Sequence, residues 1–322
     1  MPTEAAEHHI PISPVMPPVH HWRGYFLIAA ATFCWGGAAT LGKKAFNGSL
    51  FAGGGQISPL VLSQGRTTFA VLVLGLFLLG RFGRQFFRIT ARDLLISACV
   101  GIFGLAGSNY FYYLAIQKGT VALAITLQYT APVWVLLAMV GRGKERFTFR
   151  ALFSIAIAIV GIALTIDLLH AGLSFKAVPV VAAMIASFSF AFYNIMGQEL
   201  VTRNHQLKVM FFVLLSSAAL WMVLDPPWKI AAQHFSGAQW GFLFVFACLS
   251  TLLPYVFFFS GLKYLDPTRA VIASCLEPVF AILFAMIFVG EGVRAIQALG
   301  IVLVLASTLM VQTGARRPAQ ID

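Results

Sequence analysis

The segment from residue 59 to 80 reads PLVLSQGRTTFAVLVLGLFLLG and carries a single charged residue, Arg66. A helix needs ~20 mainly apolar residues to cross a ~30 Å hydrocarbon core. Similar apolar blocks, separated by charged or Pro/Gly-rich breaks, follow one another along the chain. A membrane β-barrel would instead show segments of about ten residues with alternating polarity. The pattern therefore predicts an all-α membrane protein.

The composition excludes a soluble protein. Of 322 residues, 59% are hydrophobic and 10% are charged, whereas a soluble domain has ~25% charged residues. The net charge of +11 comes mostly from short basic clusters between the apolar blocks. Such clusters indicate membrane lipids as the partner and no nucleic acid. The four cysteines lie inside apolar blocks without C-x-x-C spacing, so we assign them to packing and predict no metal site.

The apolar blocks predict ten transmembrane helices, and the basic residues predict their orientation. With the N-terminus inside, fifteen Lys and Arg residues fall on the cytoplasmic side and six on the opposite side. This asymmetry places both termini in the cytoplasm of a multi-pass inner (plasma) membrane protein. The expected helices lie near 24–46, 59–80, 93–116, 119–140, 150–169, 177–198, 207–224, 239–262, 267–289 and 294–313.

A shift of the chain on itself by 146 residues reveals an internal repeat. The shift superimposes identical residues in order: Pro132 on Pro278, Val133 on Val279, Leu137 on Leu283, Glu145 on Glu291 and Ile155 on Ile301. A unit of five spans must enter the membrane in opposite orientations in its two copies, as in many secondary transporters. We therefore expect two inverted five-helix repeats, 23–170 and 171–314, between a disordered cytoplasmic tail, 1–22, and a second cytoplasmic tail, 315–322.

Several short motifs, in this order, resemble EamA-type members of the drug/metabolite transporter superfamily over about residues 24–313. They are Cys34-Trp-Gly-Gly37 with Lys43 and Lys44, Arg66, Leu127-Gln-Tyr-Thr-Ala-Pro132 with Glu145, Leu276-Glu-Pro-Val-Phe280, Gly290-Glu291 and Gly300. The resemblance implies a duplicated five-helix unit, a central cavity lined by both halves, and transport of small molecules without ATP hydrolysis or a cofactor. The absence of a P-loop motif agrees.

Two ionisable residues inside the predicted spans are the first site candidates, Arg66 and Glu277. Such residues cost ~2.5–3.5 kcal/mol on insertion and are retained where they face protein or water. Arg66 would bind a substrate carboxylate, and Glu277 would bind a cationic group or carry a coupling proton. The alternative is that both pair with polar neighbours and only hold the helices in register.

Further polar residues share helix faces. Gln128 and Ser274 correspond under the repeat offset, and Asn109 and Tyr113 are four residues apart. A stripe on the 177–198 helix combines Ser187, Asn194 and Gln198. We expect these residues to face the protein interior, either at a cavity or in interhelical hydrogen bonds. At the end of the first helix, Lys43 and Lys44 are expected to reach the outer headgroups.

Aromatic residues inside the spans are candidates for stacking on a substrate, with core packing as the alternative. They are Trp35, Tyr129, Trp134, Tyr193 and Tyr255.

The sequence thus favours a secondary transporter that exports amino acids or related small metabolites by alternating access. Efflux of lipophilic cations or drugs remains open within the same class. A membrane-embedded enzyme or a lipid-linked flippase is the alternative of another class, but no loop holds a plausible acid/base pair or metal-ligand set, so we expect no catalytic residues.

Overall fold

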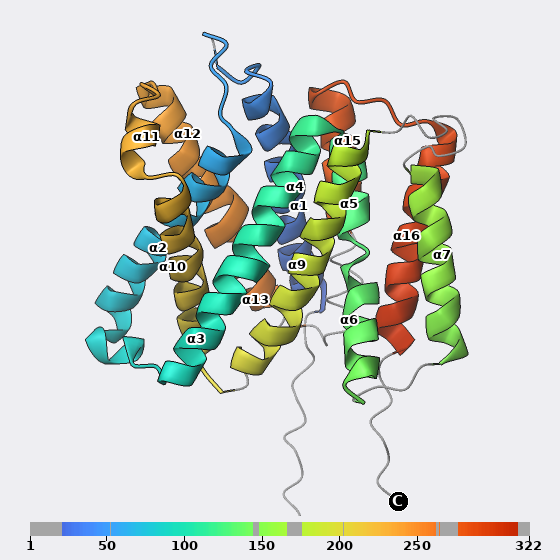
Figure 1. Ribbon diagram of the computed structural model, residues 1–322, viewed down its shortest axis with the longest axis horizontal. Helices are drawn as coiled ribbons and strands as arrows, with labels where there is room; N and C mark the ends of the chain where they lie inside the picture. The colour runs from blue at the N-terminus through green and yellow to red at the C-terminus, as the bar shows by residue number, and fades with distance from the viewer. Residues whose placement is uncertain are drawn as a thin grey trace, which may run out of the picture.

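The computed structural model describes residues 21–51, 53–143, 148–165, 176–201, 203–261, 264 and 276–314, and these residues are nearly all helical, with no strand among them (Figure 1). In this part of the chain, seven helices are long and apolar enough to span a membrane. They cover Trp22–Phe46, Pro59–Phe82, Ala91–Lys118, Val121–Gly141, Ala177–Val201, Gln206–Leu224 and Gly237–Phe258. Three shorter apolar helices lie at Phe153–Thr165, Leu276–Phe288 and Ala295–Ser307.

The helices of the first half of the chain begin and end close to the predicted bounds. They are α1 (His21–Phe46), α2 (Pro59–Phe82), the short η1 (Arg84–Phe87), α3 (Ala91–Cys99), η2 (Val100–Ala106), α4 (Gly107–Lys118), α5 (Val121–Gln128), α6 (Ala131–Gly141) and α7 (Phe149–Thr165).

The second half follows the same scheme. Its helices are α9 (Ala177–Val201), α10 (Gln206–Leu224), the short α11 (Pro227–Ala231), α12 (Gly237–Ala247), η4 (Cys248–Leu252), α13 (Leu253–Gly261), α15 (Leu276–Phe288) and α16 (Ala295–Gly314). The predicted helix 267–289 is described only from residue 276 onward. Residues 1–20 of the predicted N-terminal tail and the predicted C-terminal tail 315–322 lie outside the described residues, whereas His21 and Trp22, predicted as the end of the tail, belong to the first turn of α1.

Two of the long spans contain a π-helical segment that the sequence did not predict. The span α3–η2–α4 is wound as a π-helix over Val100–Ala106, and α12–η4–α13 over Cys248–Leu252. π-Helical turns are rare and frequently occur at functional sites, because their wider turn shifts backbone groups from their α-helical positions. The two segments thus mark the places where backbone carbonyls are displaced from regular pairing.

The predicted helix 119–140 is broken in the middle. α5 ends at Gln128 and α6 begins at Ala131, with Tyr129 and Thr130 between them and Pro132 in the first turn of α6. Proline lacks an N–H and its ring clashes with the carbonyl one turn earlier, so it is tolerated at a helix start but not inside one. The break lies near the middle of the predicted helix, and the backbone N–H groups of Tyr129 and Thr130 bond back to the carbonyls of Ile125 and Leu127.

The helices pack in a crossed pattern between the two halves of the chain. α1 packs against α13 and α15, and α9 packs against α4 and α5. α2 contacts α10 and α12, and α10 contacts α3 and η2. The pair α7 and α16 stands to one side of the bundle (Figure 1), joined by glycines: a Cβ at Gly300 would lie 2.6 Å from the Gly161 carbonyl oxygen.

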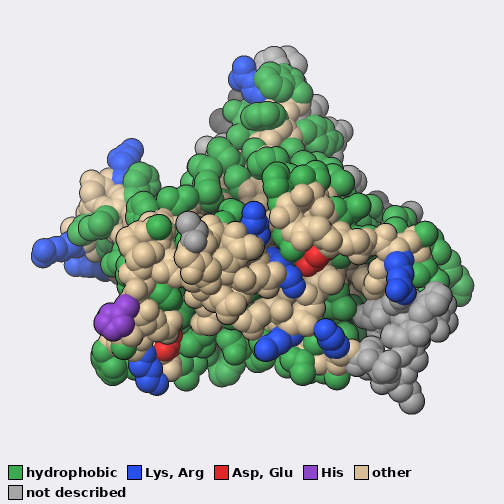
Figure 2. Space-filling model, turned by 90° about the horizontal axis from the view of Figure 1, so that it is seen from above, with side chains coloured by type: hydrophobic (Ala, Val, Ile, Leu, Met, Phe, Trp, Pro, Cys, Tyr) green, Lys and Arg blue, Asp and Glu red, His purple; other side chains and the backbone are tan. Residues whose placement is uncertain are grey.

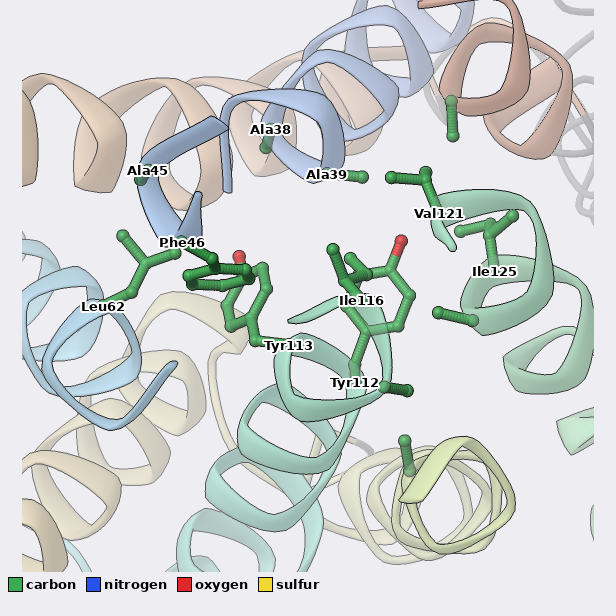
Figure 3. Packing of buried hydrophobic residues seen from close by; sticks show 14 of the residues in the cluster. Ala38, Ala39, Ala45, Phe46, Leu62, Tyr112, Tyr113, Ile116, Val121 and Ile125 are labelled. Atoms are coloured by element: carbon green, nitrogen blue, oxygen red, sulfur yellow. The ribbon is translucent and has the colours of Figure 1, made fainter. Parts of the chain in front are cut away.

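The largest buried hydrophobic cluster joins residues from several helices, some of which Figure 3 shows from close by. It draws on the C-terminal half of α1, the N-terminal turns of α2, the end of α4 and the start of α5. Ala39, Ile116 and Val121 are among its members. We call the end of the bundle that carries Lys43, the Gly119–Thr120 turn and Glu291 the Lys43 end.

Seen from above, the molecule shows scattered basic side chains and little acidic surface, around a hydrophobic periphery (Figure 2). Large apolar side chains on the outside of the helices are strongly exposed, among them Phe26, Leu76, Phe103 and Ile287. Exposed apolar area on this scale is unusual for a soluble monomer. It is the surface that a lipid bilayer covers.

Candidate substrate site

Arg66 lies at the centre of a polar network that joins three helices. Its Nε donates to Thr251 Oγ1 at 2.6 Å, and its Nη1 donates to Asn109 Oδ1 at 3.2 Å and Tyr113 OH at 2.8 Å. Its Nη2 donates to the Ser250 carbonyl oxygen at 2.8 Å. Asn109 and Tyr113 belong to α4, and Ser250 and Thr251 to the π-helix η4, so Arg66 connects both interrupted spans.

Every acceptor in this network is uncharged. Among the described residues, no carboxylate lies within ion-pair distance of Arg66. The guanidinium keeps its charge under all physiological conditions and presents donors in a planar fork that matches a carboxylate. Nη2 carries two hydrogens and donates once, so one Nη2 proton has no acceptor within the described part of the chain.

A small pocket opens beside the guanidinium. Its lining combines Arg66, Asn109 and Thr251 with the aromatic rings of Tyr193 and Tyr255. The remaining wall is mostly apolar and consists of Thr67, Leu105, Met210, Val213 and Leu214. The interior has room for about one water molecule. Any solute larger than water therefore requires the helices around the pocket to move apart.

Glu277 is held by the hydroxyl of Tyr129. Its Oε2 accepts a hydrogen bond from Tyr129 OH at 2.9 Å. Tyr129 lies in the break between α5 and α6, and Glu277 in the first turn of α15. Arg66 and Glu277 form no direct ion pair. The two ionisable groups therefore have different hydrogen-bond partners within the bundle.

The break between α5 and α6 collects further predicted polar residues. Gln128 Nε2 donates to Ser108 Oγ on α4 at 3.1 Å. Ser187 on α9 shares a 2.9 Å hydrogen bond with the Thr130 hydroxyl, and both side chains are buried. These bonds are interhelical, so Gln128 and Ser187 link α4, the break and α9.

The rest of the predicted stripe on α9 does not join this group. Asn194 is exposed in the isolated chain and donates to the Phe190 carbonyl of its own helix at 2.7 Å. The side chain of Gln198 and the whole of Ser274 lie outside the described parts of the structure.

The aromatic candidates form two groups. Trp35 packs edge-on against Tyr255, with ring centroids 5.7 Å apart, and Tyr255 lines the Arg66 pocket together with Tyr193. Trp134 packs against Phe188 with centroids 6.0 Å apart, and its indole N–H is buried without an acceptor. The structure thus brings Trp35, Tyr193 and Tyr255 toward Arg66 and leaves Trp134 elsewhere.

Lys43 does not reach outward, contrary to the prediction. Its Nζ donates to the carbonyl oxygens of Ile116, at 2.7 Å, and Gly119, and lies 3.7 Å from Glu291 Oε1. The side chains of Lys43 and Glu291 are only 11% and 10% exposed. Lys43 binds the two carbonyls at the end of α4 rather than the lipid headgroups, because a buried carbonyl without a hydrogen-bond donor is costly in free energy.

Glu291 completes this arrangement from the other half of the chain. Its Oε2 accepts the backbone N–H of Val121, the first residue of α5, at 2.8 Å. Burial raises the pKa of the Glu291 carboxyl above its usual value, against the opposing effects of the Val121 N–H and the Lys43 ammonium. An ammonium at the end of α4 and a carboxylate at the start of α5 each face the helix dipole of opposite sign.

Sequence reasoning missed three functional candidates, Thr251, the Ser250 carbonyl and the Lys43–Glu291 pair. The only available signal for the pair was that both residues belong to the short motifs that resemble the family, Lys43 after Trp35-Gly-Gly and Glu291 after Gly290. Nothing in the sequence marks Ser250 or Thr251, because their position depends on the π-helix.

The model of the EamA-like transporter family matches the chain twice, over residues 22–167 and 178–313. The chain belongs to the EamA-like transporter family. It is therefore a transporter of a multi-pass membrane family and not an enzyme, which sets aside the enzyme alternative.

Relatives of this EamA-like transporter include several bacterial and archaeal proteins. The threonine/homoserine exporter RhtA of Salmonella typhimurium is 27% identical over 83% of this chain and 87% of its own length. An uncharacterized transporter of Archaeoglobus fulgidus is 28% identical over 65% and 75%, and the uncharacterized inner membrane transporter YicL of Salmonella typhimurium is 22% identical over 92% and 98%. A crystal structure with a TM-score of 0.57 and 19% identity covers 91% of this chain and 99% of that chain, which shows a shared fold.

Proposed function

We propose that this transporter exports amino acids or related small carboxylates across the inner membrane by alternating access of two inverted five-helix halves. The observation that carries the proposal is the Arg66 network, a permanently charged group inside a span whose hydrogen bonds all go to uncharged acceptors. An unpaired charge in a low-dielectric site is costly. A substrate carboxylate supplies the missing counter-charge, and its two oxygens fit the guanidinium fork.

The size of the pocket supports a mechanism with at least two states. It lies between α2, η2, α10 and η4, which come from both halves of the chain. Because the present pocket has room for about one water molecule, substrate enters only when these helices separate. A carboxylate that replaces one of the present acceptors of Arg66 would loosen the contact between α2 and η4 and so favour that separation.

Glu277 and Tyr129 supply a second subsite in this proposal. The carboxylate of Glu277 suits the ammonium group of an amino acid or a coupling proton, and the Tyr129 hydroxyl holds it in place at 2.9 Å. An amino acid carries both charges that Arg66 and Glu277 complement. The separation of the two residues in the structure agrees with separate roles, because a direct ion pair would satisfy both without substrate.

The crossed packing supports two inverted halves at 23–170 and 171–314. In each half the first long helix packs against the third and fourth spans of the other half: α1 against α13 and α15, and α9 against α4 and α5. The third spans both contain a π-helix and both begin at a hydroxyl cap, Thr90 and Ser236, which are 146 residues apart. The two matches to the family model fall on the same halves.

The relatives support amino acids as the cargo and export as the direction. Several are named threonine/homoserine exporters, at 26% to 27% identity. At this level of identity, the preference for a particular substrate side chain depends on the residues that line the pocket of each protein. Here the apolar wall of Leu105, Met210 and Val213 favours a substrate with a short, weakly polar side chain.

Flux into proteoliposomes tests the proposal. The purified chain is reconstituted, and uptake of radiolabelled threonine, homoserine and a panel of other amino acids is measured with and without a pH gradient. Arg66→Gln removes the charge and the fork, and loss of hydrogen bonds to a charged group of ~1.5–3 kcal/mol predicts a fall in flux of about ten- to 100-fold. Arg84→Gln, an exposed arginine in η1, is the matched control and keeps wild-type flux.

Four outcomes are distinguished. Flux that falls in Arg66→Gln but not in Arg84→Gln supports the carboxylate site, and dependence on the pH gradient that disappears in Glu277→Gln supports proton coupling. Unchanged flux in Arg66→Gln overturns the site. Transport of a lipophilic cation such as tetraphenylphosphonium, abolished by Glu277→Gln and indifferent to Arg66→Gln, would instead establish the cation alternative, for which Trp35 and Tyr255 provide aromatic surfaces.

A further inference from the structure

The Lys43–Glu291 pair connects three segments that no other described salt bridge joins. Lys43 comes from the end of α1, and Glu291 from the connection between α15 and α16. Lys43 donates to the Ile116 and Gly119 carbonyl oxygens, and Glu291 accepts the backbone N–H of Val121, directly after the Gly119–Thr120 turn. Two of these segments belong to the first half of the chain and one to the second. The pair therefore fastens the two halves to each other at the Lys43 end.

The largest buried hydrophobic cluster lies at the same end. The large cluster shown in Figure 3 fills the space between α1, α4, α5 and α15. Ala39 is 2% exposed and its side chain is directed toward the start of α5, where Val121 is fully buried (Figure 3). Val121 also donates its backbone N–H to Glu291. The hydrogen bonds of Lys43 and Glu291 to the backbone around the Gly119–Thr120 turn and the apolar cluster therefore close the same end of the bundle.

Lys43 and the candidate substrate site act on the same helix. Arg66 holds α4 at Asn109 and Tyr113, and Lys43 holds it one turn later at the Ile116 and Gly119 carbonyls. A helix is stiff over this length, so a shift of α4 when Arg66 changes partners reaches the Lys43 contacts. A change at the site is thereby transmitted to the closed end.

We propose that Lys43 and Glu291 form a latch that closes the transport path at the Lys43 end, and that the latch opens when α1 and the α15–α16 connection separate from the Gly119–Thr120 turn. Release frees the end of α4 and the start of α5 and lets water reach the cluster around Ala39. The link from Arg66 to the latch rests on the proposed function, whereas the latch itself does not.

Thiol accessibility tests the latch without any substrate. The four native cysteines are first replaced by serine. Labelling of Ala39→Cys then measures opening of the Lys43 end, and labelling of Ser49→Cys, in the exposed α1–α2 connection, shows on which side of the membrane this end lies. A membrane-impermeant maleimide is applied to intact cells and to inside-out vesicles. The side that labels Ser49→Cys is the side used for the measurement, so the test holds for either orientation of the chain.

The latch variants are compared with a matched neighbour. Lys43→Met keeps the apolar stem but removes the charge and its donors, and Glu291→Ala removes the carboxylate. We expect each to speed labelling of Ala39→Cys about tenfold, within the range of coupling between sites in two-state proteins. Lys44→Met, at the adjacent half-buried lysine, leaves the labelling rate unchanged.

A cysteine in a different core separates latch opening from general loosening. Ala70→Cys lies fully buried in the cluster between α2 and α10, and its labelling stays slow in the latch variants. If labelling of Ala70→Cys and Ala39→Cys is accelerated equally, Lys43 and Glu291 only stabilise the fold as a whole, and the proposal is overturned. Unchanged labelling of Ala39→Cys in Lys43→Met and Glu291→Ala would overturn it as well.

Cross-linking tests whether opening is needed for turnover. In Lys43→Cys/Glu291→Cys, a short bis-methanethiosulfonate linker should stop threonine flux in proteoliposomes, and a reductant should restore it. Full flux with the linker in place would overturn the latch. Because the accessibility arm needs no flux, a latch that opens in a protein without amino-acid flux leaves the latch standing and removes only the proposed substrate.

Discussion

At the scale of single residues, the site depends on how Arg66 is satisfied. Its four hydrogen bonds all go to neutral acceptors. One of these acceptors is the hydroxyl of Thr251, which lies 2.6 Å from Nε, and Thr251 is only 2% exposed. Removing one partner of a buried charged donor leaves the donor desolvated, at a cost of ~1–3 kcal/mol. A substitution that keeps the shape of a side chain but removes its acceptor oxygen should therefore destabilise the network.

We expect Thr251→Val to lower the thermal stability of the detergent-solubilised protein, by an amount equivalent to about 1–3 kcal/mol of unfolding free energy. Thr126→Val provides the matched comparison, because the Thr126 hydroxyl is buried without a hydrogen-bond partner. There the substitution removes an unsatisfied group and is expected to be neutral or stabilising. Equal effects in the two variants would contradict the role given to Thr251.

A second residue-scale prediction concerns pH and Glu291. Burial raises the pKa of this carboxyl in the closed arrangement, and in an open arrangement contact with water returns the pKa to about 4.3. Protonation therefore favours closure, and closure weakens as pH rises through this window. Labelling of Ala39→Cys, normalised to Ser49→Cys, should slow when the pH at the Lys43 end falls from about 8 to about 5.

Glu291→Gln provides the control for this pH effect. It keeps a carbonyl oxygen for the Val121 N–H and has no proton to gain, so its labelling ratio should be low and independent of pH. A wild-type ratio that rises on acidification would show that the ion pair, rather than the cost of burying the carboxylate, dominates the closed end.

At the scale of elements, the two π-helices and the break between α5 and α6 account for the position of the polar groups. The segment η4 directs the Ser250 carbonyl and the Thr251 hydroxyl at Arg66. The break places Tyr129 against Glu277 and Thr130 against Ser187. In a membrane, such irregular backbone is tolerated where it is buried in protein or lines a water-filled cavity. The irregular elements therefore coincide with both polar places in the bundle.

The α7–α16 pair gives a prediction at this scale. A Cβ on Gly300 would lie 2.6 Å from both the Gly161 carbonyl oxygen and the Thr165 backbone nitrogen. Gly300→Ala should therefore force the two helices apart and lower thermal stability by about 1–3 kcal/mol, as overpacking does. Gly241→Ala in α12, where a Cβ meets nothing within 4 Å, should be neutral or slightly stabilising because alanine is the better helix former.

The comparison is made by thermal unfolding of both purified variants in the same detergent. A Gly300→Ala protein as stable as Gly241→Ala would show that α7 and α16 have room to separate, in contrast to the close approach described above.

At the scale of the whole molecule, the charge asymmetry predicts that both chain ends face the cytoplasm. A C-terminal green fluorescent protein fusion should therefore be fluorescent, and a C-terminal alkaline phosphatase fusion should be inactive in a bacterial host. An insertion of phosphatase after Ser49, in the connection between α1 and α2, should be active. Activity of both the Ser49 insertion and the C-terminal fusion would place Ser49 and the C-terminus on the same side, which requires an even number of spans between them and rejects the ten-helix arrangement.

The sequence by itself determined the class of the protein. Apolar blocks of spanning length and the order of short motifs led to a helical transporter of the EamA-like family, and most helix bounds fall within a few residues of the prediction. These features are local: the length of an apolar run and the charge of a connection depend on neighbouring residues only. Arg66 and Glu277 were likewise found from sequence, because an ionisable group within a span is visible without coordinates.

Only the tertiary structure decided which groups those residues meet. The partners of Arg66 lie 43 to 185 residues away in the chain, and Lys43 turned inward because helix ends more than 70 residues distant offered buried carbonyls. The π-helices that shift Ser250 and Thr251 have no sequence signature, since one displaced hydrogen-bond register leaves composition and periodicity unchanged. The local sequence pattern determines which segments form membrane-spanning helices. Which polar groups bind each other depends on how the helices pack, because packing excludes water and leaves buried polar groups only protein partners.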